Sequence, residues 1–254
     1  MMNGLLAFVS AALVASAYAR KFTVTNNCEY TVWPAMYTDP NVGPSVPDHV
    51  TGWEAAAGST EEFEVPDDWK AGRIWGRTEC DFSTNPGPTS CVTGGCNGGL
   101  ECDPNTGTGV PPVTVAEWTL EGDGDADWYD VSLVDGFNIP VTVKVSGDCS
   151  EASCPKDLNP DCPAELAGPS GANGNAGCKS ACFANLDGNQ QDSANCCSGS
   201  HDTADTCPPD GVDFYDYFKD ACPNSYAYAY DESSGTALWT CPTANKADYT
   251  ITFC

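Results

Sequence analysis

Positively charged side chains are scarce in this chain. Its 254 residues include 10 Lys and Arg against 36 Asp and Glu, which gives a formal net charge of −26. Phosphate backbones and anionic membrane surfaces repel a protein of this charge, so we expect neither a nucleic acid nor a membrane as partner. The balance favours a neutral or cationic ligand.

Patterns that bind metal ions are also missing. The chain has two histidines, His49 and His201, and no Cys-x-x-Cys pair, so we predict neither a metal site nor a cofactor. The acidic run 123–127, DGDAD, resembles the start of a calcium loop. Trp128 stands where such a loop needs glycine, and the distal Glu is absent, so the run favours a hairpin turn.

The chain has a single long apolar run. Residues 5–17 are apolar and end in Ala17-Tyr18-Ala19, a small-x-small cleavage site. The run is too short for a transmembrane helix. It therefore predicts a signal peptide over residues 1–19 and a secreted, extracellular protein.

Cysteine, in contrast, is abundant. Sixteen cysteines behind a signal peptide predict a framework of eight disulfides. Cys196 and Cys197 are adjacent, so each is expected to reach a different partner. The spacing alone leaves the pairing open.

Short β-rich runs separated by Gly and Pro indicate a mainly β fold, either a sandwich or a barrel. Strands are predicted at residues 22–25, 31–33, 62–65, 73–75, 113–120, 128–134, 139–146 and 248–254. Ten cysteines lie in a loop-rich stretch, in which we predict two short helices at 178–186 and 212–221. This organisation predicts a β core over 20–148, completed by 242–254, and a disulfide-rich lobe over 149–241.

Several segments resemble the thaumatin-like proteins, and the resemblance covers the whole mature chain. They are FTVTNNCEYTVWPAM (22–36), GRIWGRTECDF (72–82), AEWTL (116–120), YDVSLVDGFNIP (129–140), CPAEL (162–166), CKSAC (178–182) and FKDACPNSYAYAYDE (218–232). The resemblance implies a β-sandwich core, a second domain of disulfide-bonded loops and short helices, and an acidic cleft between them. It also implies the disulfides Cys28–Cys254, Cys80–Cys91, Cys96–Cys102, Cys149–Cys241, Cys154–Cys222, Cys162–Cys178, Cys182–Cys196 and Cys197–Cys207.

The resemblance also implies a set of site residues. Family members that bind or cleave wall glucan carry an Arg, a Glu and three Asp in the cleft, which fall here on Arg73, Glu117, Asp130, Asp135 and Asp231. Hydrolysis of a glycosidic bond needs one protonated carboxyl and one ionised carboxylate. We assign Glu117 as the general acid and Asp130 or Asp135 as base or nucleophile. Arg73 would orient a carboxylate, and Asp231 would contact sugar across the cleft.

Strand alternation tests part of this assignment. Trp118 and Leu120 share a face and are expected in the core, so Glu117 faces outward. Asp130 and Asp135 are five residues apart and would face opposite sides of a straight strand. If both line one cleft, the chain must turn before Asp135.

The resemblance implies a monomeric, secreted cell-wall protein whose partner is β-1,3-glucan, acting as an endo-β-1,3-glucanase. Two other functions stay open. One is a non-catalytic glucan-binding antifungal defence protein, and the other is an inhibitor of another secreted hydrolase. A chance grouping of carboxylates also stays open, because the chain has 36 of them.

Overall fold

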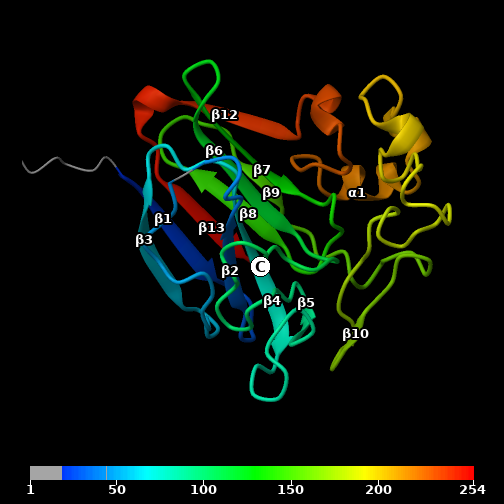
Figure 1. The fold of residues 1–254 in the computed structure, drawn as a ribbon, viewed down its shortest axis with the longest axis horizontal. Helices are drawn as coiled ribbons and strands as arrows, with labels where there is room; N and C mark the ends of the chain where they lie inside the picture. The colour runs from blue at the N-terminus through cyan, green and yellow to red at the C-terminus, as the bar shows by residue number, and fades with distance from the viewer. Residues whose placement is uncertain (1–18, 44) are drawn as a thin grey trace, which may run out of the picture.

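Two β-sheets packed face to face form most of the computed structural model, which describes residues 19–43 and 45–254. Beside them lies a lobe of loops and short helices (Figure 1). The predicted signal peptide, residues 1–19, lies outside the described residues except for Ala19, which begins the first strand. The predicted β-sandwich with a disulfide-rich lobe is confirmed.

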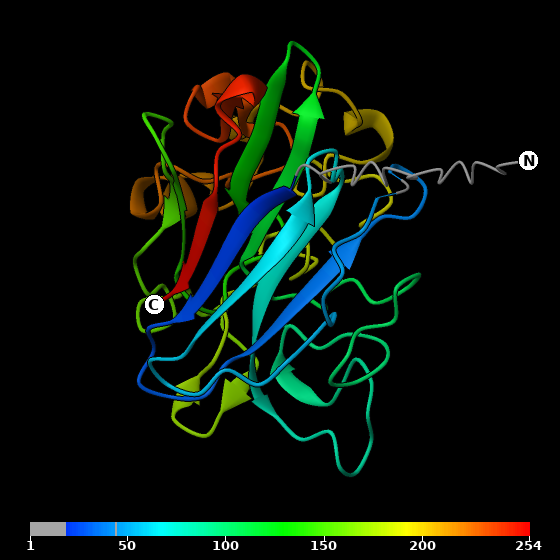
Figure 2. The same ribbon diagram turned by 90° about the vertical axis from the view of Figure 1, so that its left-hand side faces the viewer.

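The first sheet has five strands and contains both ends of the described chain. Its order is β3 (Thr60–Pro66), β1 (Ala19–Asn26), β13 (Tyr249–Phe253), β8 (Val141–Val145) and β9 (Ala152–Cys154). β13 runs parallel to β1 and antiparallel to β8. Figure 2 shows β13 in red beside β1 in dark blue and β3 in cyan.

The second sheet positions the candidate site. Its order is β12 (Leu238–Pro242), β7 (Ala126–Ser132), β6 (Val115–Gly122), β4 (Gly72–Cys80) and β2 (Trp33–Thr38), and β5 (Cys91–Thr93) pairs with the far end of β4. Alternate side chains of these strands point into the sandwich, where Trp118 packs edge-on against Phe22 of the other sheet at 5.1 Å between ring centroids. The other alternate residues form an outer face beneath the lobe.

The lobe contains little regular structure. Its elements are β10 (Ser170–Gly171), β11 (Gly174–Asn175), α1 (Tyr215–Ala221) and the 3-10 turns η1 (Gly199–His201), η2 (Pro209–Gly211) and η3 (Asp231–Ser234); η4 (Thr243–Asn245) follows β12. No helix within 19–43 and 45–254 has the length and apolarity to cross a bilayer.

All sixteen cysteines are paired, in the eight pairs that the resemblance implies. The Cys28–Cys254 bond ties the end of β1 to the end of β13. Cys154–Cys222 ties the lobe to β9, and Cys149–Cys241 ties the connection between β8 and β9 to β12 of the second sheet. The adjacent Cys196 and Cys197 bond to different partners, Cys182 and Cys207.

Some predicted element positions were wrong. The helix predicted at 178–186 is wrong: Cys178 forms an isolated β-bridge and residues 181–187 form consecutive turns, because disulfides at Cys178 and Cys182 anchor the segment and Asn185 has a left-handed φ of 54°. The strand predicted at 31–33 begins only at Trp33. β9 and most of β12 fall inside the range predicted for the lobe, yet they extend the two sheets.

Candidate functional site

Three of the predicted site residues form a row across the outer face of the second sheet. Arg73 of β4 lies opposite Glu117 of β6, and Glu117 lies opposite Asp130 of β7. Their neighbours Ile74 and Trp118 are buried in the core. The prediction that Glu117 faces outward, away from Trp118, is therefore confirmed.

The chain turns before Asp135, as the alternation required. β7 ends at Ser132, and the amide of Gly136 donates to the carbonyl of Leu133 at 2.8 Å. Gly136 has a φ of 85°, and a Cβ there would lie 2.6 Å from the carbonyl oxygen of Cys178. Glycine is needed at this position for both reasons. The turn places Asp135 on the same cavity as Asp130.

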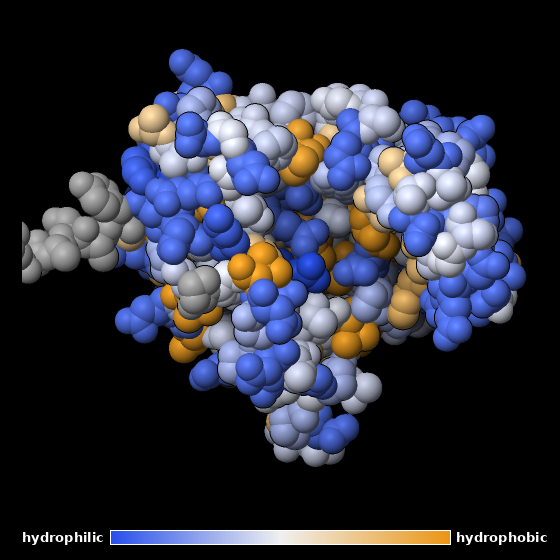
Figure 3. Space-filling model, turned by 45° about the horizontal axis from the view of Figure 1, so that its top comes forward, coloured by the Kyte–Doolittle hydropathy of each residue, from blue (hydrophilic) through white to orange (hydrophobic). Residues whose placement is uncertain are grey.

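The cavity has a volume of about 580 Å³ and lies between the second sheet and the lobe. Figure 3 shows this hollow in the middle of the surface, with hydrophilic side chains at its floor. The described residues that line it are Ala71, Gly72, Arg73, Glu117, Trp118, Thr119, Trp128, Asp130, Ser132, Val134, Asp135, Tyr226, Ala229, Glu232 and Leu238. Arg73 is the one basic residue among them.

Arg73 and Glu117 form an ion pair at 2.8 Å from Nη2 to Oε1, with each side chain 32% exposed. A second guanidinium nitrogen of Arg73 donates to the hydroxyl of Thr108 at 3.2 Å. Desolvation raises the pKa of Glu117, and repulsion from Asp135 adds to this, although Arg73 opposes both. Glu117 therefore holds a proton to higher pH than an ordinary glutamate does.

Asp130 lies directly opposite Glu117 on β7. Desolvation raises its pKa well above the usual range, repulsion from Glu117 raises it further, and Arg73 opposes the shift. Its Oδ1 is buried and has no hydrogen-bond partner in the described chain. Because two close carboxyls resist ionising together, the charge of Glu117 favours the protonated form of Asp130.

Asp135 has a raised pKa for the same leading reason, desolvation, which Arg73 again opposes. We call Arg73, Glu117, Asp130 and Asp135 the open cluster. It combines three carboxyls that tend to keep protons with one guanidinium, around a cavity that reaches solvent.

The structure does not bring Asp231 into this cavity. Its side chain is fully buried and accepts hydrogen bonds from Tyr215, from Lys219 and from the amide of Ala227, each at 2.9 Å. The predicted sugar contact is corrected, since all of these partners lie inside the lobe. The next residue, Glu232, lines the cavity instead and accepts a bond from Tyr226. The motif YDE contains two adjacent acids, and no sequence signal selects between them.

A second arginine meets carboxylates inside the sandwich. Arg20 donates to Asp67 at 2.6 Å and to both oxygens of Asp127, at 2.6 and 3.2 Å, and all three residues are buried. Lys246 pairs with Asp67 at 2.8 Å, and Tyr249 donates to Asp127 at 3.2 Å. We call these five residues the closed cluster.

The closed cluster corrects part of the interpretation of the acidic run. The turn at 123–125 joins β6 to β7 as predicted, but Asp127 points inward to Arg20 and belongs to the core. Within the described chain, no three His, Cys, Asp or Glu side chains are grouped so that they could hold a metal ion.

Comparison with known proteins gives consistent results. A sequence profile described as the Thaumatin family matches residues 26–254. The chain is 43% identical over 253 residues to pathogenesis-related protein 5 of Arabidopsis thaliana, covering 98% of this chain and 95% of the relative. It is 43% identical over 245 residues to thaumatin-like protein 1 of Pyrus pyrifolia, covering 94% and 93%.

Among solved structures, the fold is similar to a GH family 64 laminaripentaose-producing β-1,3-glucanase of Paenibacillus barengoltzii complexed with laminarihexaose. The TM-score is 0.55 at 11% identity, covering 95% of this chain and 78% of the other. At that identity the likeness concerns the fold alone.

Proposed function

The chain belongs to the thaumatin family, and from this premise we propose that it is a secreted protein that binds β-1,3-glucan in the acidic cavity and hydrolyses it. The observation that carries the proposal is the open cluster, in which three carboxyls with raised pKa values surround one cavity with one guanidinium. A neutral polysaccharide is the substrate that a net charge of −26 tolerates.

The chemistry follows from the positions. Glu117 and Asp130 share a proton, and Glu117 donates it to the glycosidic oxygen because its side chain is about a third exposed, whereas Oδ1 of Asp130 is buried. The bond from the anomeric carbon to that oxygen breaks, and its electron pair stays on the oxygen. Asp135 takes a proton from water, and the water oxygen bonds to the anomeric carbon. Arg73 opposes the rise in the pKa of Asp135, which favours its ionised form, and orients Glu117.

The surroundings of the open cluster support binding of a sugar chain. Trp128 and Tyr226 line the cavity with aromatic surface, and Glu232 and Ser132 line it with hydrogen-bonding groups. The eight disulfides support an extracellular location, because such bonds persist in oxidising compartments. The names of the relatives, pathogenesis-related and thaumatin-like proteins, support a role in defence against fungal walls.

The test is release of reducing ends from a linear β-1,3-glucan at mildly acidic pH. We expect turnover by the unmodified chain and a loss of about 100-fold or more in Glu117→Gln. Thr108→Ala serves as a control, because it leaves the three carboxyls of the open cluster and Glu232 in place. Equal release by Glu117→Gln and the unmodified chain would exclude the assigned chemistry.

A binding-only protein with the same cavity is the second candidate, and the coupled, desolvated Glu117–Asp130 pair favours it if both carboxyls stay protonated at working pH. Retention on insoluble β-1,3-glucan, measured together with the release of reducing ends, separates the two functions. Retention without reducing ends, lost in Asp130→Ala, would identify a glucan-binding protein that does not cleave.

A further inference from the structure

A second cavity lies at the other end of β4 from the open cluster. It has a volume of about 680 Å³, and residues of five separate segments line it. Arg73 starts β4 at the first cavity, and Thr78 and Glu79 end the strand at the second. Six residues of extended chain span about 20 Å, so one ligand group cannot touch both.

We propose that this second cavity is a binding site for a neutral oligosaccharide, independent of the acidic cavity. We call it the Tyr30 cavity. The described residues that line it are Tyr30, Thr31, Trp33, Thr78, Glu79, Asn138, Ile139, Asp157, Asn159, Pro160, Ala172, Asn173, Gly174, Asn175 and Ala176. The proposal goes beyond the function assigned above, because it requires no carboxyl of the open cluster.

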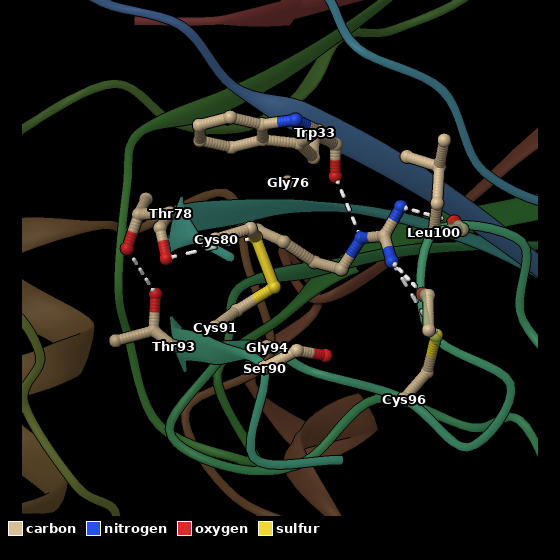
Figure 4. The surroundings of a disulfide bond; sticks show 12 residues. Trp33, Gly76, Thr78, Cys80, Ser90, Cys91, Thr93, Gly94, Cys96 and Leu100 are labelled. Atoms are coloured by element: carbon tan, nitrogen blue, oxygen red, sulfur yellow. Dashed lines mark hydrogen bonds between the residues drawn. A yellow bond between two sulfur atoms is a disulfide. The ribbon is translucent and has the colours of Figure 1, made fainter. Parts of the chain in front are cut away.

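Two aromatic side chains line the Tyr30 cavity. Tyr30 is 50% exposed, and Trp33 is half-buried beside it on β2. Figure 4 shows Trp33 near the Cys80–Cys91 disulfide and near Thr78, whose hydroxyl is bonded to Thr93. The C–H faces of a pyranose ring are apolar and pack against such rings, so exposed aromatics next to polar groups fit a sugar.

Hydrogen-bond donors and acceptors also line the Tyr30 cavity. Asn159 Oδ1 is buried and has no partner in the described chain, while its Nδ2 donates to the carbonyl of Asn138 at 2.7 Å, which defines the orientation of the amide. An acceptor in that state gains from a hydroxyl donor. A neighbouring hollow of about 300 Å³ shares Tyr30, Asn138, Asp157 and Asn159 with the Tyr30 cavity, so Asn159 lies where the two spaces meet.

The charges select the class of ligand. Glu79 and Asp157 are the charged residues among the described lining, and no Lys, Arg or His is there. Burial raises the pKa of Tyr30, and the charges of Asp157 and Glu79 raise it further, so its hydroxyl stays protonated. A phosphate, sulfate or uronate would be repelled. A neutral chain of hydroxyls fits the aromatic and amide groups and needs no counter-charge.

The walls are held in place before any ligand arrives. Glu79 accepts a bond from the amide of Ala172 at 2.8 Å, which ties the β10–β11 hairpin to the end of β4. Gly171 makes this approach accessible, since a Cβ there would lie 2.2 Å from Glu79 Oε1. The loop of Tyr30 is held by the Cys28–Cys254 bond and by Asn26, which donates to the Tyr30 carbonyl at 2.8 Å. A site held in this way loses little entropy on binding.

Tryptophan resonances allow each site to be followed separately. Trp33 lines the Tyr30 cavity and Trp128 lines the acidic cavity. The experiment titrates protein labelled with 15N at its indoles with laminarihexaose, cellohexaose and xylohexaose, and with a glucosamine hexamer as the cationic arm. We expect at least one neutral hexasaccharide to shift Trp33, and to shift it equally in the double variant Glu117→Gln, Asp130→Asn.

Variants give the site its second test. Tyr30→Ala removes an aromatic anchor and should raise the dissociation constant measured at Trp33 about tenfold or more, while Tyr30→Phe keeps the ring and should stay close to the unmodified chain. Phe183→Ala is the matched control, an aromatic 38% exposed that does not line this cavity. The Trp128 response should be the same in all three variants.

Three outcomes would overturn the proposal. They are a Trp33 resonance that no neutral hexasaccharide moves, one that only the glucosamine hexamer moves, and one whose response is unchanged in Tyr30→Ala. A protein that fails to cleave glucan but still shows the Tyr30-dependent shift would reject the proposed hydrolysis and retain this site.

Discussion

The open and closed clusters contain the same ingredients, an arginine with several carboxylates, and differ in what surrounds them. In the closed cluster Arg20 makes charged bonds to Asp67 and Asp127, and Asp127 accepts further bonds from Tyr249 and from the amide of Glu121. In the open cluster one Arg73 serves three carboxyls, and one oxygen of Asp130 has no partner within the described residues. Carboxylates whose hydrogen bonds are all made within the protein stabilise the fold, and carboxyls with an unused acceptor can interact with a ligand.

The electrostatic shifts have opposite signs in the two clusters. Burial opposes ionisation of Asp67, but hydrogen bonds from Lys246 and Arg20 outweigh it and lower its pKa. In the open cluster burial prevails over Arg73, and the pKa values of Glu117 and Asp130 rise. Two cations, Lys246 and Arg20, donate hydrogen bonds to Asp67, whereas Arg73 alone opposes the stronger desolvation of the carboxyls in the open cluster, so the two pKa shifts differ in sign.

The largest expected effect comes from breaking the closed cluster. Asp127→Ala should cost about 3–5 kcal/mol of unfolding free energy, because it leaves Arg20 buried with one carboxylate fewer. Urea unfolding with the disulfides intact measures it. Asp123→Ala, an exposed acid in the same hairpin, should change stability by less than about 0.5 kcal/mol. Equal losses in the two variants would contradict the distinction between the clusters.

The adjacent acids Asp231 and Glu232 sharpen the comparison at the edge of the cavity. Asp231→Asn should cost about 1–3 kcal/mol, because an amide cannot accept from Lys219, Tyr215 and the Ala227 amide together. Glu232→Gln should leave stability within about 0.5 kcal/mol. Glucan retention should fall in Glu232→Gln, which lines the cavity. A larger loss of stability in Glu232→Gln than in Asp231→Asn would contradict the assignment of Asp231 to stability and of Glu232 to glucan binding.

Stability should depend on pH in opposite ways at Asp130 and Asp67. The pKa of Asp130 is higher in the folded protein than in the unfolded chain, where it is near 3.8. The contribution of Asp130 to stability is therefore fully present below pH 3.8 and is lost as pH rises through the pKa of the folded state. Asp130→Asn should therefore raise the unfolding free energy by about 1 kcal/mol at pH 7 and little at pH 3. Thermal unfolding across pH measures this.

Asp67 provides the matched variant, since its lowered pKa gives stability that is present above 3.8 and lost as pH falls through the folded pKa. Asp67→Asn should destabilise at pH 7 and approach the unmodified chain in strong acid. The same pH dependence of stability in both variants would show that the pKa shifts of Asp130 and Asp67 on folding do not have opposite signs.

The smallest expected effect concerns Arg73. Its charge opposes the rise in the pKa values of Glu117, Asp130 and Asp135, so Arg73→Gln should move their titrations to still higher pH. Carboxyl 13C resonances followed through pH measure this. Arg73→Lys keeps the charge and should stay close to the unmodified chain. Stability should change by under about 1 kcal/mol, because the Arg73–Glu117 pair is a third exposed. Titrations that do not move would show that Arg73 does not tune the cluster.

The motif resemblance named the residues of the open cluster, and strand alternation predicted the direction of one of them. Trp118 and Leu120 mark the core face of β6, and this places Glu117 outside. The turn before Asp135 followed from the five-residue spacing and the Val-Asp-Gly-Phe segment. Motif resemblance supplied the disulfide pairs, which spacing left undecided.

The closed cluster and the Tyr30 cavity were not predictable. Asp127 looks like any other acid in a run of acids, and its burial depends on Arg20, which is 107 residues away. The lining of the Tyr30 cavity comes from segments far apart in the chain, so no local pattern marks it. Asp231 and Glu232 differ only in the direction that the η3 turn gives them.

The position of β13 determines when the protein can fold. The last strand lies between β1 and β8, and the bond that closes it joins cysteines 226 residues apart. Until the ribosome has made residues 249–253, the first strand has no partner on that side, and β8 has none there either. The five-stranded sheet can therefore be completed only when β13 pairs with both β1 and β8, and a chain that lacks β13 leaves two unpaired strand edges open to aggregation.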